Sequence, residues 1–166
     1  YGLSKVFQDS LCKQYYKMFK LNIIRAILFN TSGPGKKFDV FFDICNQFSK
    51  QYHKKKIVIK CGNLNNFRDF MHVEDVAKAL FFLSNKGLAG ESYNIGSAKL
   101  TKISKIIEIL KKKYKKNIVT KIDKKLLRDY DEKFITASIK KIRKLGWKPR
   151  KKVDDIIDDM INRPIN

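Results

Sequence analysis

Residues 4 to 35 constrain the fold most, because three elements follow one another there without a break. Residues 4 to 19 repeat apolar side chains at three- and four-residue steps, which predicts an amphipathic helix. The run from Ile23 to Phe29 is short and rich in isoleucine, as expected of a strand buried on both faces. Turn-forming residues fill positions 30 to 35. A helix, a strand and a Gly/Pro loop in this order are typical of an α/β unit, whose ligands gather at the carboxyl ends of its strands.

The rest of the chain continues this alternation of helices and strands. The helix that begins at Glu74 starts with acidic residues, which suit the helix dipole, and Thr101 is expected to cap the helix after it. Helices are predicted over residues 40–52, 74–84, 101–114, 138–145 and 153–161, and strands over 57–59, 92–96 and 118–122.

The composition fits a globular chain. Of 166 residues, 43% are hydrophobic and 12% aromatic, which argues against disorder. No apolar run approaches the ~20 residues of a membrane span, and no charged-then-apolar leader is present, so we expect a cytoplasmic protein with no membrane partner. Cys12, Cys45 and Cys61 are odd in number and widely spaced, which fits reduced thiols better than disulfides or zinc. His53 and His72 stand alone in the sequence, so no metal site is expected.

The formal charge of +21 raises nucleic acid as a possible partner. The 37 basic residues are mostly lysine, whereas base readout and bidentate phosphate contacts favour arginine. We therefore interpret most lysines as solvated faces, some of which attract an anionic small substrate, and expect no specific nucleic-acid partner.

Tyr1 and Lys5 lie four residues apart, on one face of the first helix. A phenol titrates near ~10 in isolation, but a nearby ammonium favours the phenolate. The pair can therefore relay a proton beside a carbonyl or a carbinol. The alternative is an ordinary helix start with one apolar and one solvated side chain.

A series of short blocks follows along the chain. They are Tyr1-Gly-Leu-Ser-Lys5, Arg25-Ala-Ile-Leu-Phe-Asn30, Gly33-Pro-Gly35, Gly62-Asn-Leu, Arg68-Asp-Phe-Met-His-Val-Glu-Asp75, Tyr93-Asn-Ile-Gly-Ser97 and Leu145-Gly-Trp-Lys-Pro149. In order and spacing they resemble the extended short-chain dehydrogenase/reductase family, also called the NAD-dependent epimerase/dehydratase family. Within it, the chain is most similar to the branch of GDP-mannose 4,6-dehydratase and the GDP-4-keto-6-deoxymannose reductases.

The resemblance implies the C-terminal part of a Rossmann-type NAD(P)-binding fold plus a smaller α/β substrate-binding lobe. Residues 1–35 would end the dinucleotide-binding domain. Residues 36–166 would form mainly the nucleotide-sugar lobe, with 62–96 crossing back to the cofactor domain. No Gly-x-x-Gly-x-x-Gly follows a strand in this sequence, so we expect the C-terminal half of a longer protein. The resemblance implies a homodimer or homotetramer for the complete protein.

The resemblance also assigns roles to single residues. Tyr1 and Lys5 would be the catalytic pair and, with Phe29 and Thr31, would contact NAD or NADP. Substrate binding would fall to Asn30, Arg68, Arg128 and Asp131, with an arginine gripping the diphosphate and Asp131 meeting a ribose hydroxyl. The structural alternatives are a turn cap for Asn30 and a local ion pair with Asp69 for Arg68.

The implied reaction is hydride transfer between a nicotinamide ring and C4 of a nucleotide-bound hexose. Reduction or dehydration of a GDP-mannose-derived sugar fits the resemblance best. An epimerase, a catalytically silent GDP-sugar-binding remnant and a basic nucleic-acid-binding domain remain open as alternatives.

Overall fold

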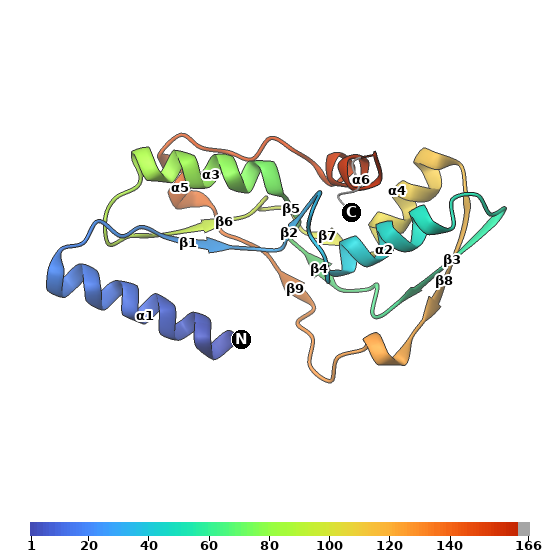
Figure 1. The fold of residues 1–166 in the computed structure, drawn as a ribbon, viewed down its shortest axis with the longest axis horizontal. Coiled ribbons are helices and arrows are strands. Elements are labelled where there is room, and N and C mark those ends of the chain that lie inside the picture. The colour runs from blue at the N-terminus through green and yellow to red at the C-terminus, as the bar shows by residue number, and fades with distance from the viewer. Residues whose placement is uncertain (163–166) are drawn as a thin grey trace.

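Two parallel strand pairs, at opposite ends of the molecule, organise the fold (Figure 1). The computed structural model describes residues 1–162. At one end β1 (Arg25–Leu28) pairs with β6 (Ser92–Ile95), and at the other β3 (Lys56–Cys61) pairs with β8 (Asn117–Ile122). The chain is therefore α/β, with parallel pairing at both ends.

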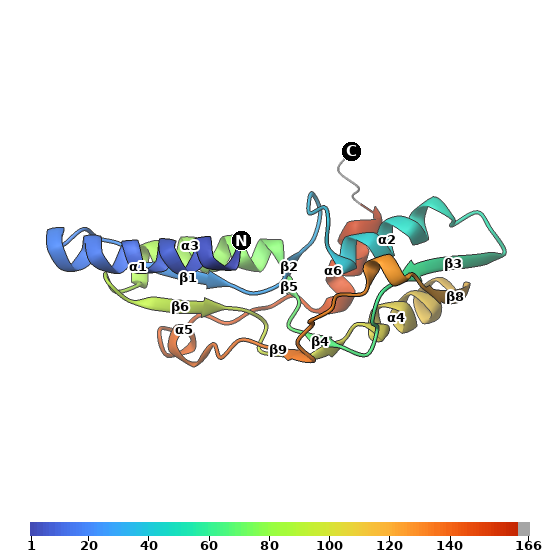
Figure 2. The same cartoon turned by 90° about the horizontal axis from the view of Figure 1, so that it is seen from below.

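The first end carries three helices around the β1–β6 pair. α3 (Val73–Lys86) and α5 (Lys140–Lys144) pack on it around a core that contains Tyr93, Ile95 and Trp147. α1 (Gly2–Phe19) runs alongside β1 without burying any of its residues (Figures 1 and 2). This end, with its core and α1, is called the N-terminal side below.

The second end is the lobe, in which three helices share a core with one face of the β3–β8 pair. α2 (Val40–Lys50), α4 (Ser104–Tyr114) and α6 (Val153–Asn162) bring together a larger core that includes Phe41, Phe48, Ile59, Ile106 and Ile157. α2 is capped by Asp39, whose carboxylate accepts the Phe42 N–H at 2.7 Å.

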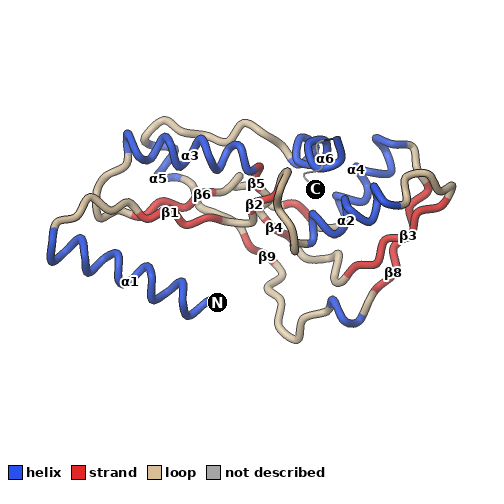
Figure 3. The backbone as a smooth tube through the Cα atoms, in the orientation of Figure 1, coloured by secondary structure: helices blue, strands red, loops and turns tan. Residues whose placement is uncertain are grey.

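Short strands join the two ends (Figure 3). β2 (Thr31–Ser32) pairs with β5 (Met71–His72), and β4 (Phe67–Arg68) lies between β7 (Thr101–Lys102) and β9 (Phe134–Ile135). A 3₁₀ turn, η1 (Lys124–Leu126), follows β8. Among the described residues, no helix is long and apolar enough to cross a membrane.

Two local predictions are wrong. Thr101 was expected to cap a helix, but it lies in β7, where its backbone pairs with Arg68 of β4. The helix α4 starts at Ser104. The predicted strand from Ile23 to Phe29 is shorter, and Ile27 and Leu28 are exposed. A strand of this kind is buried where the sheet continues beside it and helices cover both faces of that sheet. Here β1 is paired with β6 alone in the described chain.

Candidate active site

A cavity of about 910 Å³ opens where the two ends of the molecule meet. Its walls come from residues 27–31, 36–44, 60–64 and 125–128, together with Tyr1 and several separate side chains. Seven of the eight predicted site residues line it: Tyr1, Phe29, Asn30, Thr31, Arg68, Arg128 and Asp131. Lys5 is not among the lining residues.

Tyr1 lies at the open mouth of this cavity, and Lys5 lies one helical turn further along α1. The Tyr1 side chain is free of packing, with 96% of the residue exposed. The Lys5 Nζ lies 5.5 Å from the Tyr1 ring centroid and donates to the Gln8 Oε1 at 3.1 Å. Phenol and ammonium are thus one helical turn apart, and both remain accessible to a ligand.

Asn30 and its neighbours occupy the carboxyl end of β1. The Asn30 carbonyl accepts the Met71 N–H at 2.9 Å, which fixes the backbone while the residue stays exposed to the cavity. The Thr31 hydroxyl donates to the Phe29 carbonyl at 3.0 Å. The next loop turns at Gly33, where a Cβ would meet the Val73 side chain at 2.7 Å.

The Arg68 guanidinium is held by the loop across the cavity and by the Phe67 carbonyl at 2.8 Å, and not by the Asp69 carboxylate. The guanidinium pairs with Asp131 at 2.5 Å and donates to the Glu132 carbonyl at 2.7 Å, while only 8% of the residue is exposed. Asp131 also accepts from the Asn66 amide. Two predicted substrate residues therefore bind each other, and the carboxylate that pairs with Arg68 lies 63 positions away.

Asp69 is accordingly a structural residue, and the alternative of an Arg68–Asp69 ion pair is wrong. Asp69 is fully buried, and its carboxylate accepts the backbone N–H groups of Ser97, Ala98 and Ala137. These hydrogen bonds connect the end of β6 to the segment before α5. A buried carboxylate requires such donors, because an unsatisfied charge in the interior is costly.

The loop after β8 closes the basic side of the cavity. Lys125 and Arg128 come from this loop, and both line the cavity with Lys36 and Lys60 of the opposite wall. The loop approaches closely at Gly62, where a Cβ would lie 2.5 Å from the Leu126 carbonyl oxygen. A cavity with four cations besides Arg68 suits a polyanionic ligand.

The sequence did not indicate one acidic side chain that lines this cavity. Asp43 belongs to the first turn of α2 and lines the cavity. Partial burial, helped by the charge of Asp39, raises its pKa above the ordinary value. Its position in the first turn is ordinary for an acidic residue, so the sequence carried no signal of its place in the cavity.

The three cysteines, Cys12, Cys45 and Cys61, lie in α1, α2 and β3. All three are free, and burial raises the pKa of the Cys45 thiol to about 12. Burial also raises the pKa of Cys61, which lines the cavity.

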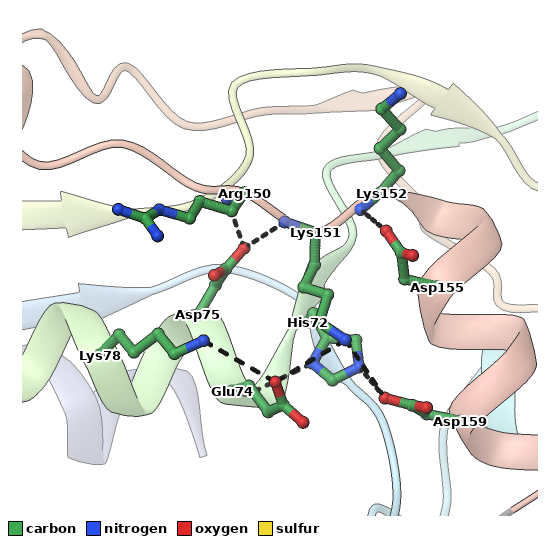
Figure 4. Close-up of polar contacts among 9 residues, drawn as sticks. All are labelled: His72, Glu74, Asp75, Lys78, Arg150, Lys151, Lys152, Asp155 and Asp159. Carbon is green, nitrogen blue, oxygen red and sulfur yellow. Dashed lines mark hydrogen bonds and ion pairs between the residues drawn. The ribbon is translucent and has the colours of Figure 1, made fainter.

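His72 is not isolated in the fold, as its sequence position had suggested. Its Nδ1 accepts the Glu74 N–H and its Nε2 lies 3.1 Å from the Asp159 carboxylate (Figure 4). Lys151 lies near both carboxylates, at 3.7 Å from Glu74 and 3.6 Å from Asp159. These His72, Glu74 and Asp159 atoms lie within 4.8 Å of one another, but both ring nitrogens already have partners. The cluster joins α6 to the start of α3, outside the cavity.

Comparison with known proteins identifies the family. The family model for GDP-mannose 4,6 dehydratase matches residues 1–160. The chain belongs to this family of extended short-chain dehydrogenases/reductases. It is 29% identical over 155 residues to the GDP-6-deoxy-D-mannose reductase of Pseudomonas aeruginosa, covering 90% of this chain and 50% of that protein. The chain thus spans about half the length of this relative.

Solved members of the family share the fold. The Pseudomonas aeruginosa protein RMD, solved with NADPH, superposes with a TM-score of 0.82 at 25% identity, covering 98% of this chain and 54% of that one. The UDP-glucuronic acid 4-epimerase of Bacillus cereus, solved with UDP-glucuronic acid and NAD, gives the same TM-score and identity over 98% of this chain and 51% of its own. The Rossmann-type α/β fold expected from the sequence is confirmed.

Proposed function

We propose that this chain supplies the catalytic tyrosine and the nucleotide-sugar cavity of an NAD(P)-dependent enzyme. The proposed reaction is reduction or dehydration at C4 of a GDP-mannose-derived hexose. The observation that carries the proposal is the shared cavity, because Tyr1, Asn30 and Arg68 all line it. The relatives support the class of activity, since they act on nucleotide sugars and have been solved with NADPH or with NAD.

The cavity suits a sugar nucleotide at both of its ends. Arg68, Arg128 and the wall lysines offer the charge-assisted donors that a diphosphate requires. Tyr1 stands at the mouth with its hydroxyl unpacked, so a sugar held by its diphosphate can present a hydroxyl or carbonyl there. The proposed roles of Asn30 and Asp131 are contacts to the sugar and to the ribose.

The chain's residues fit one part of a nicotinamide cofactor. Tyr1 and Lys5 are exposed and one turn apart, as a pair that binds the nicotinamide ribose would be, while Phe29 and Thr31 border the same opening. The cofactor, when bound, supplies or accepts the hydride. Tyr1 then gives a proton to the forming alkoxide or takes one from the hydroxyl, and the Lys5 ammonium stabilises the phenolate. The pyrophosphate would need a Gly-rich loop, which this sequence lacks.

Turnover by Tyr1→Phe tests the proposal, in an enzyme that joins this chain to the dinucleotide-binding half of a relative. The substitution removes one hydroxyl, so the rate should fall by ~10²–10⁴-fold while substrate affinity changes little. Lys5→Met should lower both the rate and the affinity for the cofactor.

Tyr15→Phe is the matched control, since Tyr15 lies on the same helix and outside the cavity. It should keep the parent rate. If Tyr1→Phe keeps more than about half of that rate, the loss is far below the contribution of general acid–base catalysis. Tyr1 is then an ordinary helix residue, and the catalytic assignment is wrong.

A further inference from the structure

The exposed edge of β3 is covered by side chains of α2. The Gln47 amide donates to the Lys60 carbonyl at 2.9 Å and accepts the Lys60 N–H at 2.8 Å. The Gln51 amide likewise donates to the Val58 carbonyl at 2.9 Å and accepts the Val58 N–H at 3.2 Å. Each glutamine therefore replaces the missing neighbour strand at one residue of β3.

Asp43 continues this row by one more helical turn, toward the cavity. It precedes Gln47 by four positions, so it lies on the same face of α2. Gly62 follows Lys60 by two positions, and Gly62 and Asp43 both line the cavity. At this step of the row a carboxylate, which only accepts hydrogen bonds, takes the place of an amide that both donates and accepts.

Asp43 has no partner within the described chain. Among residues 1–162, none forms a hydrogen bond or an ion pair with its carboxylate, although the cavity holds several lysines and arginines. Desolvation, helped by the nearby charge of Asp39, raises the pKa of this carboxyl. A carboxylate in this state is suited to a ligand that brings its own donors.

Resting on the proposed function, we propose that Asp43 is the residue that selects guanine as the base of the nucleotide sugar. Guanine carries two adjacent donors, N1–H and the 2-amino group, which one carboxylate can accept together. Uracil and thymine flank their single N–H with carbonyl oxygens, and adenine and cytosine place a ring acceptor beside their amino group. Those edges bring lone pairs against the carboxylate and are rejected.

Phe38 offers a face on which such a base can stack. It lines the same cavity and is 92% exposed, in a left-handed backbone conformation with φ of 61°. Non-glycine residues in this conformation are uncommon and occur often at ligand sites. Stacking on an aromatic ring is indifferent to the base, so the choice of base falls to Asp43.

The experiment measures the dissociation constants of GDP, XDP and UDP for the 166-residue chain by calorimetry. XDP carries a 2-oxo group where GDP has the 2-amino group, so it presents an acceptor at that position. The unsubstituted chain should bind GDP at least about tenfold more tightly than either competitor, a difference of about 1.4 kcal/mol. Asp43→Asn should reverse the order of GDP and XDP, because the asparagine amide can donate to the 2-oxo group.

Two further variants separate base selection from other effects. Asp129→Asn removes the same charge from an exposed residue outside the cavity lining and should keep the preference for GDP. Phe38→Ala should weaken all three nucleotides by similar factors. A gain of XDP binding by Asp43→Asn cannot come from unfolding, so it supports the assignment directly.

The outcomes distinguish this inference from the function on which it rests. If all three nucleotides bind and Asp43→Asn leaves the ratio of GDP to XDP affinity unchanged, the role of Asp43 is overturned and the nucleotide cavity stands. If the unsubstituted chain binds none of them at millimolar concentration, the proposed nucleotide site itself is wrong, and the role of Asp43 with it.

Discussion

The lobe and the N-terminal side each have a long helix with apolar side chains, and only the helix of the lobe buries them. α2 buries Phe41, Ile44, Cys45 and Phe48 in the core of the lobe. α1 is longer and buries no residue, and its Leu3, Phe7 and Met18 are well exposed. The two helices differ in the elements that pack against them. A strand pair and two helices pack against α2, whereas α1 has no buried residue.

This difference makes the apolar surface of α1 a candidate interface. Exposed apolar surface of this extent usually marks an interface. We propose that the apolar surface of α1 and the free edge of β1 contact a dinucleotide-binding half. Residues 1–35 would then end that domain, with 62–96 crossing back to it through β6. Residues 137–147 would join the same domain, because Ala137, Ile142 and Trp147 share a core with Tyr93 and Ile95.

Removing one aromatic ring from each region should give the largest contrast. Phe48→Ala empties a fully buried site in the lobe and should lower the free energy of unfolding by about 3–5 kcal/mol. Phe7→Ala removes an exposed ring of α1 and should change it by less than about 0.5 kcal/mol. Denaturant unfolding of the 166-residue chain measures both. Equal losses would show that α1 is buried in solution, contrary to the account.

Two similar ion pairs, one in each region, offer the next test. Arg68–Asp131 and Arg25–Asp9 are both 2.5 Å long and similarly covered, but only the first lines the cavity. Arg68→Ala should weaken GDP-mannose binding by about 2–4 kcal/mol, the range for loss of a buried charge partner. Arg25→Ala should lower the stability of the fold about as much as Arg68→Ala does, and it should leave GDP-mannose binding unchanged. Calorimetry with thermal unfolding checks both, and equal effects on binding would remove Arg68 from the site.

The exposed face of α1 should also govern association of the chain. Phe7→Glu places a charge on this face and should weaken self-association by about tenfold, equivalent to about 1.4 kcal/mol. Lys17→Glu, on the same helix, is the control for the change of charge and should have a smaller effect. Sedimentation at several concentrations gives the constants. If both variants associate as the parent does, α1 is not the associating surface.

The smallest contrast is between two carboxylates with opposite pKa shifts. Hydrogen bonds from Lys13 and Arg25 lower the pKa of Asp9, so its stabilisation is present above the ordinary pKa and is lost as pH falls through the lowered one. Asp43 has a raised pKa, so it reduces stability as pH rises from its ordinary to its raised value. Asp9→Asn should therefore destabilise the chain at pH 7, and Asp43→Asn should stabilise it. Both effects should stay below about 1 kcal/mol, because both groups are partly solvated. Thermal unfolding between pH 3 and pH 7 measures them, and the opposite signs would contradict the electrostatic account.

The sequence could predict what depends on local pattern. The α/β class and the positions of α2, α3 and α6 follow from apolar periodicity, and ordered motifs placed the chain in its family. It could not predict contacts made by distant residues. The pairing of Arg68 with Asp131, the contact of His72 with Asp159, and the place of Asp43 in the cavity lining all need the fold. The prediction that Thr101 caps a helix is wrong because strand pairing overrides its local capping preference.

We propose that a GDP-sugar occupies the cavity between the two regions. The most direct test is the footprint of GDP-mannose on the backbone amide NMR signals of the 166-residue chain. We expect saturable shifts at cavity residues from both regions, such as Asn30, Gly62 and Arg68. Shifts that gather instead on the lysine-rich segment 111–116, or the absence of any saturable shift, would contradict it.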